Sequence, residues 1–399
     1  MAATGVLVVV VALVFAVTVA GGGGAGVGGD GGFITWEDLS MPAGAARSST
    51  WDDTAGGGGG KRSGGGGGGG EQRTTIVVSP DGTGHSRTVQ GAVDMVPAGN
   101  TRRVKIVVRP GVYREKVTVP ITKPFVSLIG MGTGHTVITW HSRASDVGAS
   151  GHQVGTFYSA SVAVEADYFC ASHITFENSA AAAAPGAVGQ QAVALRLSGD
   201  KTVLYKCRIL GTQDTLFDNI GRHYLYNCDI QGSIDFIFGN ARSLYQSCHK
   251  LTIQAFTNSS ILYLTAKELL TLGCTLHAVA TSYGAIAASQ RSSPSEESGF
   301  SFVGCRLTGS GMLYLGRAWG KYSRVVYSYC DLSGIIVPQG WSDWGDQSRT
   351  KTVLFGEYNC KGPGASTKQR VPWSRTLTYD EARPFIGRSF INGEQWLRL

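Results

Sequence analysis

The sequence lacks several features that would place it in common functional classes. It contains eight cysteines but no Cys-x-x-Cys pair, which argues against a zinc site or a thioredoxin-like redox site. It has no run of lysines and arginines interleaved with aromatic residues, so nucleic-acid binding is disfavoured. Its N-terminal apolar block, residues 5–20, is 16 residues long, whereas a membrane-spanning helix needs about 20. We therefore expect no nucleic-acid partner, no metal and no cofactor.

The N-terminal segments are not expected to contribute to a core. The apolar block ends in small residues before a glycine, as signal peptides do, although the residues before it carry no basic side chain. We predict a signal peptide at 1–20 and a secreted protein; an uncleaved anchor is the alternative. Residues 21–72 are rich in glycine and bury too little surface to offset the entropy of ordering them. They are predicted to be a disordered linker, interrupted by FITWEDLS at 33–40.

The remaining residues, 73–399, are expected to form one domain. This length is large for one globular core but ordinary for a solenoid of stacked repeats. The formal net charge is +7 with histidine neutral, and the pI is about 9.0. A basic balance favours an anionic partner, such as an acidic polymer or a membrane surface.

Strand-like phrases recur at a nearly constant spacing after residue 160. Phrases such as KTVLYKC, HYLYNC and RVVYSYC share an aromatic residue followed shortly by cysteine. Cys207, Cys228 and Cys248 follow one another at almost equal intervals, and β-branched or aromatic residues alternate with polar ones. A fixed period with several short strands is typical of a parallel β-helix, in which each repeat is one coil. We therefore predict an all-β solenoid in which residues one period apart stack along the axis.

Two further features belong to this scheme. The stacked cysteines can be explained equally well by buried packing and by at least one disulfide in the column. Val89, Ala92, Val93 and Val96 have helical spacing. We predict a short helix there that caps the N-terminal end of the core.

Polar residues suited to chemistry follow the same period. Asp235 follows Asp214 at the same interval at which Cys228 follows Cys207, and the interval from Gln191 to Gln213 is nearly equal to it. These side chains should therefore lie on three consecutive coils and on one face. Two neighbouring carboxylates cannot both ionise freely, so one can become an acid while the other stays a nucleophile if a cation holds it.

Arg317, in YLGRAWG, is the candidate for that cation. Amide side chains beside the carboxylates can donate to a developing oxyanion. The set fits acyl transfer by a carboxylate nucleophile. The alternative is that the aspartates only decorate the turns of a solenoid.

Nine phrases, in a fixed order, make the chain similar to the plant pectinesterase (pectin methylesterase) family over essentially all of residues 74–399. They are GVYREKV (111–117), ITFENSA (174–180), QAVALR (191–196), QDTL (213–216), DFIFGNA (235–241), LGRAW (315–319), GWSDWGD (340–346), FGEYNCKGPGA (355–365) and INGEQWL (391–397). The resemblance implies a right-handed, single-stranded parallel β-helix. It also implies an enzyme that removes methyl esters from pectin in the plant cell wall, acts as a monomer, and can meet a proteinaceous inhibitor.

The resemblance implies roles for the periodic residues. Asp235 would attack the methyl-ester carbonyl, and Asp214 would protonate the departing methanol and then activate water. Gln191 and Gln213 would stabilise the oxyanion, while Arg317 would hold Asp235 by two hydrogen bonds.

Three more residues would meet the sugar. The resemblance places Trp319 and Phe238 in the wall of the cleft, and Thr156, in GTFYSASV, against the substrate.

The chain also departs from the family pattern. Ala318 stands where the family usually has proline, which predicts a looser loop after Arg317. Thr212 replaces an aromatic residue and Phe217 replaces tyrosine, changes expected to alter the walls of the cleft rather than the chemistry. The inhibitor-like domain that many plant members carry at their N-terminus is replaced by the glycine-rich sequence.

A larger departure is a predicted insertion at residues 249–274, which carries the chain's only glycosylation sequon, Asn258-Ser259-Ser260. Removing it leaves SLYQSCTLHAVATSYGAIAASQR, an uninterrupted coil. We interpret it as a retained intron or gene-model error, with a genuine surface loop as the alternative.

Two other functions are possible on a solenoid that meets the same polymer. A pectate lyase needs a calcium cluster, and a polygalacturonase needs closely grouped aspartates; neither pattern lies beside Asp214 and Asp235. A non-catalytic pectin-binding solenoid would result if the insertion disrupted the fold.

Overall fold

The computed structural model describes residues 32–42, 74–182, 187–246 and 274–399. The predicted signal peptide, most of the predicted linker and nearly all of the predicted insertion lie outside these residues. Within them, every helix is too short or too polar to cross a membrane.

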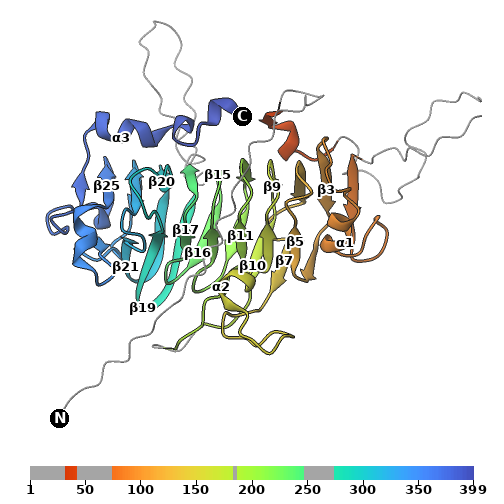
Figure 1. Cartoon of the computed structure of the whole chain (residues 1–399), viewed down its shortest axis with the longest axis horizontal. Helices are drawn as coiled ribbons and strands as arrows, with labels where there is room; N and C mark the ends of the chain where they lie inside the picture. Colours follow the sequence, from red (N-terminus) through yellow and green to blue (C-terminus); the bar gives the residue numbers. More distant parts are fainter. Residues whose placement is uncertain (1–31, 43–73, 183–186, 247–273) are drawn as a thin grey trace, which may run out of the picture.

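The chain winds into a stack of coils whose strands pair in parallel (Figure 1). One face of the stack is an 11-stranded sheet, and the other two faces are the arms of a 14-stranded sheet. The long strands β19 and β21 run through both arms and so join them. A typical coil visits the three faces in turn, for example β12, β13 and β14, before β15 begins the next coil. The predicted parallel β-helix is therefore confirmed.

Each face is made of parallel strands contributed by successive coils. The 11-stranded sheet consists of β2 (Thr75–Val78), β3 (Val104–Val108), β6 (Val126–Gly130), β9 (Cys170–Ser172), β12 (Thr202–Tyr205), β15 (Arg222–Tyr226), β18 (Arg242–Gln246), β20 (Gly299–Val303), β22 (Arg324–Ser328), β25 (Leu354–Tyr358) and β26 (Arg375–Thr376). The first arm consists of β4 (Gly111–Arg114), β7 (Thr136–Trp140), β10 (Thr175–Asn178), β13 (Arg208–Leu210), β16 (Asp229–Gly232), the first halves of β19 (Thr275–Ser289) and β21 (Arg306–Arg317), and β23 (Asp331–Leu332). The second arm consists of β5 (Val117–Val119), β8 (Val162–Val164), β11 (Leu195–Leu197), β14 (Leu216–Asp218), β17 (Ile237–Gly239), the second halves of β19 and β21, and β24 (Trp341–Ser342).

Stacking of like residues builds the core. Tyr245, Phe302 and Tyr327 lie opposite one another on β18, β20 and β22. All three are fully buried, and successive ring centroids are 4.6 Å apart. That distance matches the spacing of neighbouring strands in a sheet, so each coil presents its aromatic ring directly over the last.

The predicted cysteine column exists, but Cys274 occupies the position expected for Cys248. Cys207, Cys228, Cys274 and Cys305 are buried, and all seven cysteines of the described ranges are free. The Cys228 thiol donates to the Leu204 carbonyl, and the later thiols of the column contact a carbonyl of the preceding coil in the same way. In these residues the packing interpretation of the column holds, with each thiol satisfying a buried carbonyl.

The contacts of Cys274 bear on the predicted insertion. The Cys274 Sγ atom lies 3.3 Å from the Gln246 carbonyl oxygen, much as the Cys228 Sγ atom lies 3.6 Å from that of Tyr226. In the earlier coil a single residue, Asn227, joins the two. The boundary of the predicted insertion is therefore wrong by one position, because Cys274 belongs to the coil. Deleting 248–273 nevertheless leaves the same sequence as deleting 249–274.

We predict that a chain without 248–273 folds and keeps its specific activity. One residue can span the gap, and shortening a long connection should raise the free energy of unfolding by about 3 kcal/mol. Thermal unfolding and methanol release, measured on both forms, check this. If the shortened chain failed to fold, residues 248–273 would be an integral part of the structure.

The N-terminal end of the core is covered as predicted. Helix α1 (Val89–Asp94) buries Val89, Ala92 and Val93 against the first coils. Thr88 caps it by accepting a hydrogen bond from the Gly91 amide.

A segment within the predicted linker belongs to the fold. Strand β1 (Ile34–Thr35) and helix η2 (Glu37–Leu39) lie along the 11-stranded sheet, beside the C-terminal strand β27 (Leu397–Arg398) (Figure 1). Asp38 pairs with Arg103, and the Ser172 hydroxyl donates to the Leu39 carbonyl. Burial of Ile34 and Leu39 explains why this phrase, unlike the glycine around it, has a place on the sheet.

The same face carries the C-terminal helices. Helix α3 (Tyr379–Ile386) begins with a complete capping box between Thr378 and Glu381. It is followed by η5 (Arg388–Ile391) and η6 (Gly393–Gln395), while η3 (Gln347–Lys351) and η4 (Pro363–Ala365) lie in the loops of the last coils.

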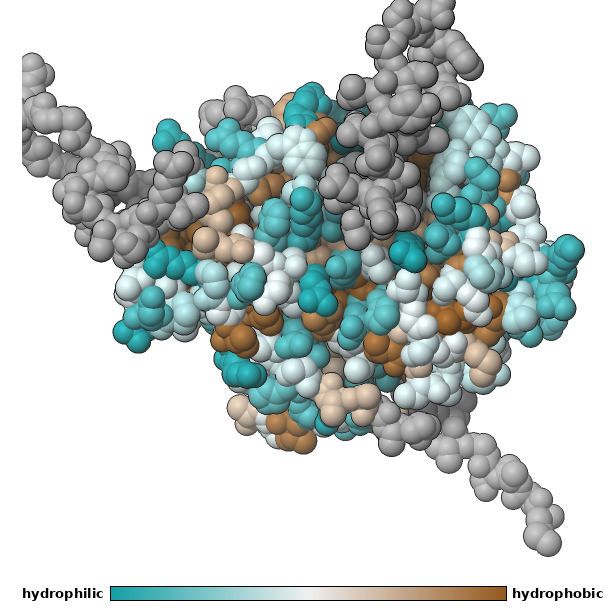
Figure 2. All heavy atoms as spheres, turned by 180° about the vertical axis from the view of Figure 1, so that it is seen from behind, coloured by the Kyte–Doolittle hydropathy of each residue, from teal (hydrophilic) through white to brown (hydrophobic). Residues whose placement is uncertain are grey.

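Hydrophilic and hydrophobic side chains are interspersed on the surface seen from behind (Figure 2).

A buried histidine–carboxylate pair lies inside the stack. His223 donates through Nδ1 to Asp218, and its Nε2 atom lies 2.8 Å from the Gly199 carbonyl oxygen. Tyr245 donates to the other carboxylate oxygen of Asp218. Burial alone would lower the pKa of His223, but its two acceptors outweigh burial and raise that pKa. The pair has no contact with the cavity described below, so we assign it to the fold.

Candidate active site

The two predicted carboxylates lie at equivalent corners of adjacent coils, where the first arm turns into the second. The Asp214 amide donates to the Ile234 carbonyl, and Leu216 lies opposite Ile237, so an offset of one period places Asp235 one coil beyond Asp214. The spatial relation predicted from the spacing is confirmed.

Both corners share the pattern Gly-x-x-Asp. The aspartates have positive φ angles, +57° for Asp214 and +45° for Asp235, which cost about 1–2 kcal/mol each for a residue with a side chain. A Cβ atom on Gly232 would lie 2.1 Å from the Phe236 Cβ atom, so glycine is needed for the chain to fold back. Non-glycine residues with positive φ recur elsewhere in the stack, for example Lys201 and Lys206, so this backbone conformation is not confined to the site.

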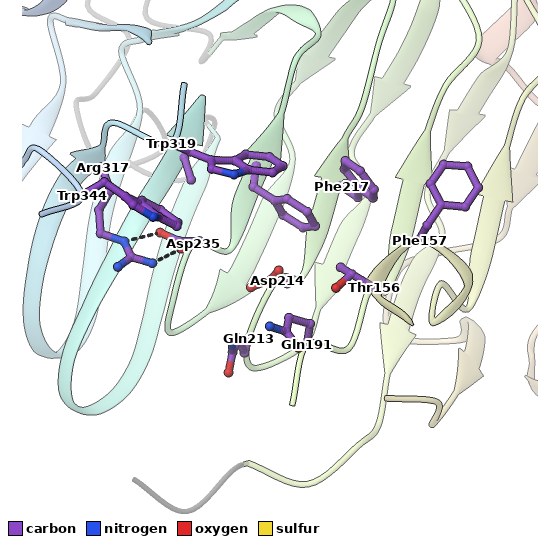
Figure 3. Close-up of a pocket in the computed structure, with 12 residues that line it drawn as sticks. Thr156, Phe157, Gln191, Gln213, Asp214, Phe217, Asp235, Arg317, Trp319 and Trp344 are labelled. Carbon is purple, nitrogen blue, oxygen red and sulfur yellow. Dashed lines mark hydrogen bonds and ion pairs between the residues drawn. The ribbon is translucent and has the colours of Figure 1, made fainter. Parts of the chain in front are cut away.

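A cavity of about 510 Å³ opens over these corners. All eight predicted site residues line it: Thr156, Gln191, Gln213, Asp214, Asp235, Phe238, Arg317 and Trp319. Its volume lies in the range expected for a ligand site. Figure 3 shows Arg317 reaching the Asp235 carboxylate, with Asp214 and the two glutamines grouped nearby.

Asp235 is held by Arg317, as predicted. The Arg317 Nε atom donates to one carboxylate oxygen at 2.9 Å, and its Nη2 atom donates to the other. Trp344 stacks on the guanidinium, whose carbon lies 4.0 Å from the ring centroid. Burial raises the pKa of Asp235, while the hydrogen bonds and charge of Arg317 oppose this rise. Of the two carboxyls, Asp235 is therefore the one that ionises first.

Asp214 has the opposite electrostatic character. Burial raises its pKa well above the usual range, and the charge of Asp235 raises it further. Arg317 and a hydrogen bond with Gln213 lower it, but they do not reverse the shift. The site therefore places a carboxylate held by a cation beside a carboxyl whose pKa is raised much further, the arrangement expected of a nucleophile and an acid.

Gln213 shares the corner of Asp214, and Gln191 comes from the corner one coil earlier. Gln213 is the neighbour of Asp214 in the chain, and the Ala192 amide donates to the Gln213 carbonyl, which ties the Gln191 corner to the next coil. Both side chains face the cavity. Their amides can supply donors for a negatively charged oxygen.

Aromatic side chains form the walls. Phe217 and Phe238 stack with centroids 4.4 Å apart on β14 and β17, and Trp319 lies 6.1 Å from Phe238. At the other end Phe157, on α2 (Gly155–Tyr158), meets Phe217 edge to face. Flat apolar walls with a few polar groups suit a sugar ring.

Sequence spacing missed Phe157 and Trp344 as site residues. Phe157 follows Thr156 directly, and Trp344 lies in the phrase GWSDWGD. Both phrases belong to the family resemblance, which could therefore have identified them. The loop after Arg317, predicted to be looser because Ala318 replaces proline, has a backbone hydrogen bond of its own. The Ala318 amide donates to the Ser342 carbonyl at 2.9 Å, a bond that proline could not form.

We predict that Arg317→Ala lowers stability as well as activity. It leaves the 6%-exposed Asp235 carboxylate without a partner, at a cost of up to about 3 kcal/mol in the free energy of unfolding. Chemical denaturation and methanol release check both effects. If Arg317→Ala matched the unsubstituted chain in both assays, Arg317 would not be the group that holds Asp235.

The chain is similar to known proteins over most of its length. A family model described as Pectinesterase matches residues 75–271 and 273–394. Pectinesterase QRT1 of Arabidopsis thaliana is 52% identical over 326 residues, which are 81% of this chain and 79% of the relative. The chain belongs to the pectinesterase family. Pectinesterase 31 of the same plant is 41% identical over 334 residues, 81% of this chain and 94% of the relative.

Solved pectinesterase structures share the fold. The pectin methylesterase from carrot is 33% identical with a TM-score of 0.69, over 80% of this chain and 94% of that one. The pectin methylesterase from Aspergillus niger is 27% identical with a TM-score of 0.63, over 81% and 95%. The protein is thus a carboxylic ester hydrolase with pectin methylesterase activity, as the resemblance implied.

Proposed function

We propose that the protein hydrolyses the methyl esters of galacturonate units in pectin, with Asp235 as nucleophile and Asp214 as general acid and base. The observation that carries this assignment is the Asp235–Arg317 ion pair beside Asp214, whose pKa burial raises, in one aromatic-walled cavity. An ionised carboxylate beside a protonated one supplies both roles that ester cleavage requires.

In the first half-reaction the Asp235 carboxylate attacks the ester carbonyl carbon. The carbonyl oxygen becomes an oxyanion, which the side-chain amides of Gln191 and Gln213 stabilise. As the intermediate collapses, the bond to the methoxy oxygen breaks and Asp214 gives that oxygen its proton. Methanol leaves, and the galacturonyl group stays on Asp235 as an anhydride.

In the second half-reaction Asp214, now ionised, removes a proton from water. The hydroxide adds to the galacturonyl carbonyl, and collapse of this intermediate returns Asp235 as a carboxylate. The product is a galacturonate carboxyl, and Asp214 has regained its proton. One ester and one water molecule give one acid and one methanol.

The experiment is methanol release from methyl-esterified pectin by the purified chain, with titration of the acid formed. We expect equal amounts of methanol and acid and no shortening of the polymer. Polymer shortening without methanol would favour a lyase or a glycoside hydrolase and would overturn the proposal.

We also propose that the protein is secreted to the cell wall, acts as a monomer, and is open to a proteinaceous pectinesterase inhibitor. The apolar block at 5–20 and the nature of the polymer support secretion. Sequencing the N-terminus of protein recovered from plant cell walls tests cleavage near Ala20, light scattering tests the monomer, and inhibition of methanol release by a purified inhibitor tests the last partner.

A further inference from the structure

Arg317 is the last residue of β21, and the chain turns immediately after it. Arg317 lies opposite Ser342 of β24, and the Trp319 amide donates back to the Arg317 carbonyl at 3.0 Å. This turn decides where two cavity residues point, since Arg317 precedes it and Trp319 ends it. Alanine at position 318 leaves φ freer than proline would, and the Ala318 amide bond to the Ser342 carbonyl is one of the contacts that hold the turn.

Arg349, on η3, contacts the backbone of this turn. Its Nη1 atom donates to the carbonyls of both Ala318 and Trp319, the latter at 2.8 Å. Its Nε atom donates to Asp346 at 3.0 Å. One guanidinium thus joins the two peptide oxygens that follow Arg317 to the loop between β24 and η3.

The Asp346 end of this contact is itself anchored. Asp346 is the N-cap of η3, where its carboxylate accepts from the Ser348 amide at 3.0 Å and from the Ser348 hydroxyl at 2.7 Å. The same loop presents Trp344, at a φ of +64°, to the face of the Arg317 guanidinium. The loop therefore contacts Arg317 directly through Trp344 and its following turn through Arg349.

We propose that Arg349 is a positioning residue of the reaction: it fixes the turn at 317–319 and thereby the aim of Arg317 at Asp235. The inference rests on the proposed function. Arg349 does not line the cavity, so it acts through the turn and has no contact with substrate.

The consequence concerns both the rate and its pH dependence. Asp235 is faced by the positive Arg317 and, from the preceding coil, by Asp214. If Arg317 is less well aimed, Asp235 is less readily ionised, so the acidic limb of kcat/KM moves to higher pH. A misplacement of about 1 Å in a catalytic group can cost about 100-fold in rate.

The experiment compares Arg349→Met and Arg349→Lys with a control, Arg222→Met. Arg222 pairs with Asp200 on the 11-stranded sheet, and its side chain is 23% exposed against 22% for Arg349. Replacing either arginine by methionine thus removes a similar ion pair, but of the two only Arg349 contacts the turn at 317–319. The readouts are kcat, KM, the pH profile of kcat/KM, and the thermal midpoint.

We expect Arg349→Met to lower kcat/KM by about 10- to 100-fold and to shift the acidic limb upward. Arg349→Lys keeps the charge but not the forked donors, so its kcat/KM should lie between that of Arg349→Met and that of the unsubstituted chain. Arg222→Met should lower the midpoint at most and leave the limb in place. If Arg349→Met fails to fold, Arg349→Lys and Asp346→Asn carry the same test, with smaller shifts.

The inference would be overturned if the acidic limb stayed in place in folded Arg349 variants. A purely structural contact would lower stability without moving that limb. The proposed function fails differently. In that case the unsubstituted chain releases no methanol, or Asp235→Asn retains the activity that the unsubstituted chain has.

Discussion

Asp235→Asn is expected to lower kcat for methanol release by about 10⁴-fold or more while the protein stays folded. Asparagine has nearly the same shape as aspartate, but its amide is a poor nucleophile. The β-helix core beneath the corner, which includes the fully buried Phe236 and Ile237, is untouched. Methanol release and circular dichroism, measured on one preparation, separate loss of chemistry from loss of fold.

Asp229→Asn is the matched control. Asp229 lies on β16 of the same coil and is not among the residues that line the cavity. It should keep the activity of the unsubstituted chain. Equal losses in the two variants would mean that any charge change in this coil is harmful, and a fully active Asp235→Asn would move the nucleophile elsewhere.

Asp214→Asn is expected to lower kcat by about 10²- to 10⁴-fold, because one residue serves as the acid of the first half-reaction and the base of the second. The alkaline limb of the pH profile, which reports loss of the Asp214 proton, should disappear from the residual activity. Rate measurements from acidic to alkaline pH check both points. A retained alkaline limb would show that another group supplies the proton.

The same substitution should change stability in a pH-dependent way. Burial and the Asp235 charge raise the pKa of folded Asp214, so its ionisation costs more in the folded than in the unfolded state. Stability is therefore lost as the pH rises from the unfolded-state pKa, about 4, through the folded-state pKa. Asparagine cannot ionise, so Asp214→Asn should have the higher thermal midpoint at neutral pH. A midpoint difference that does not grow with pH would contradict the raised pKa.

The two Gly-x-x-Asp corners show a trade between stability and activity. Their left-handed aspartates and buried carboxyl groups oppose folding. The stacked coils around them, with fully buried rows such as Tyr245, Phe302 and Tyr327, stabilise the structure enough to hold them. A regular solenoid is therefore a suitable scaffold for a strained site.

The periodic part of the site could be predicted from the sequence. In a parallel stack, residues one coil apart in sequence are neighbours in space, because each strand lies in register on the last. The interval from Asp214 to Asp235 equals one period and therefore placed the two carboxyls on adjacent coils. The similar interval between the glutamines placed Gln191 one coil before Gln213, which shares the Asp214 corner. The capping helix followed from its helical spacing in the same way.

Only the tertiary structure decided which groups meet across loops. Arg317 is 82 residues from Asp235 in the sequence, and Trp344 and Arg349 reach the turn at 317–319 from a loop whose length no period dictates. The cysteine column shows the same limit. Spacing alone selected Cys248, whereas the thiol that completes the stack is Cys274, because a parallel coil is defined by strand pairing rather than by the number of residues between strands.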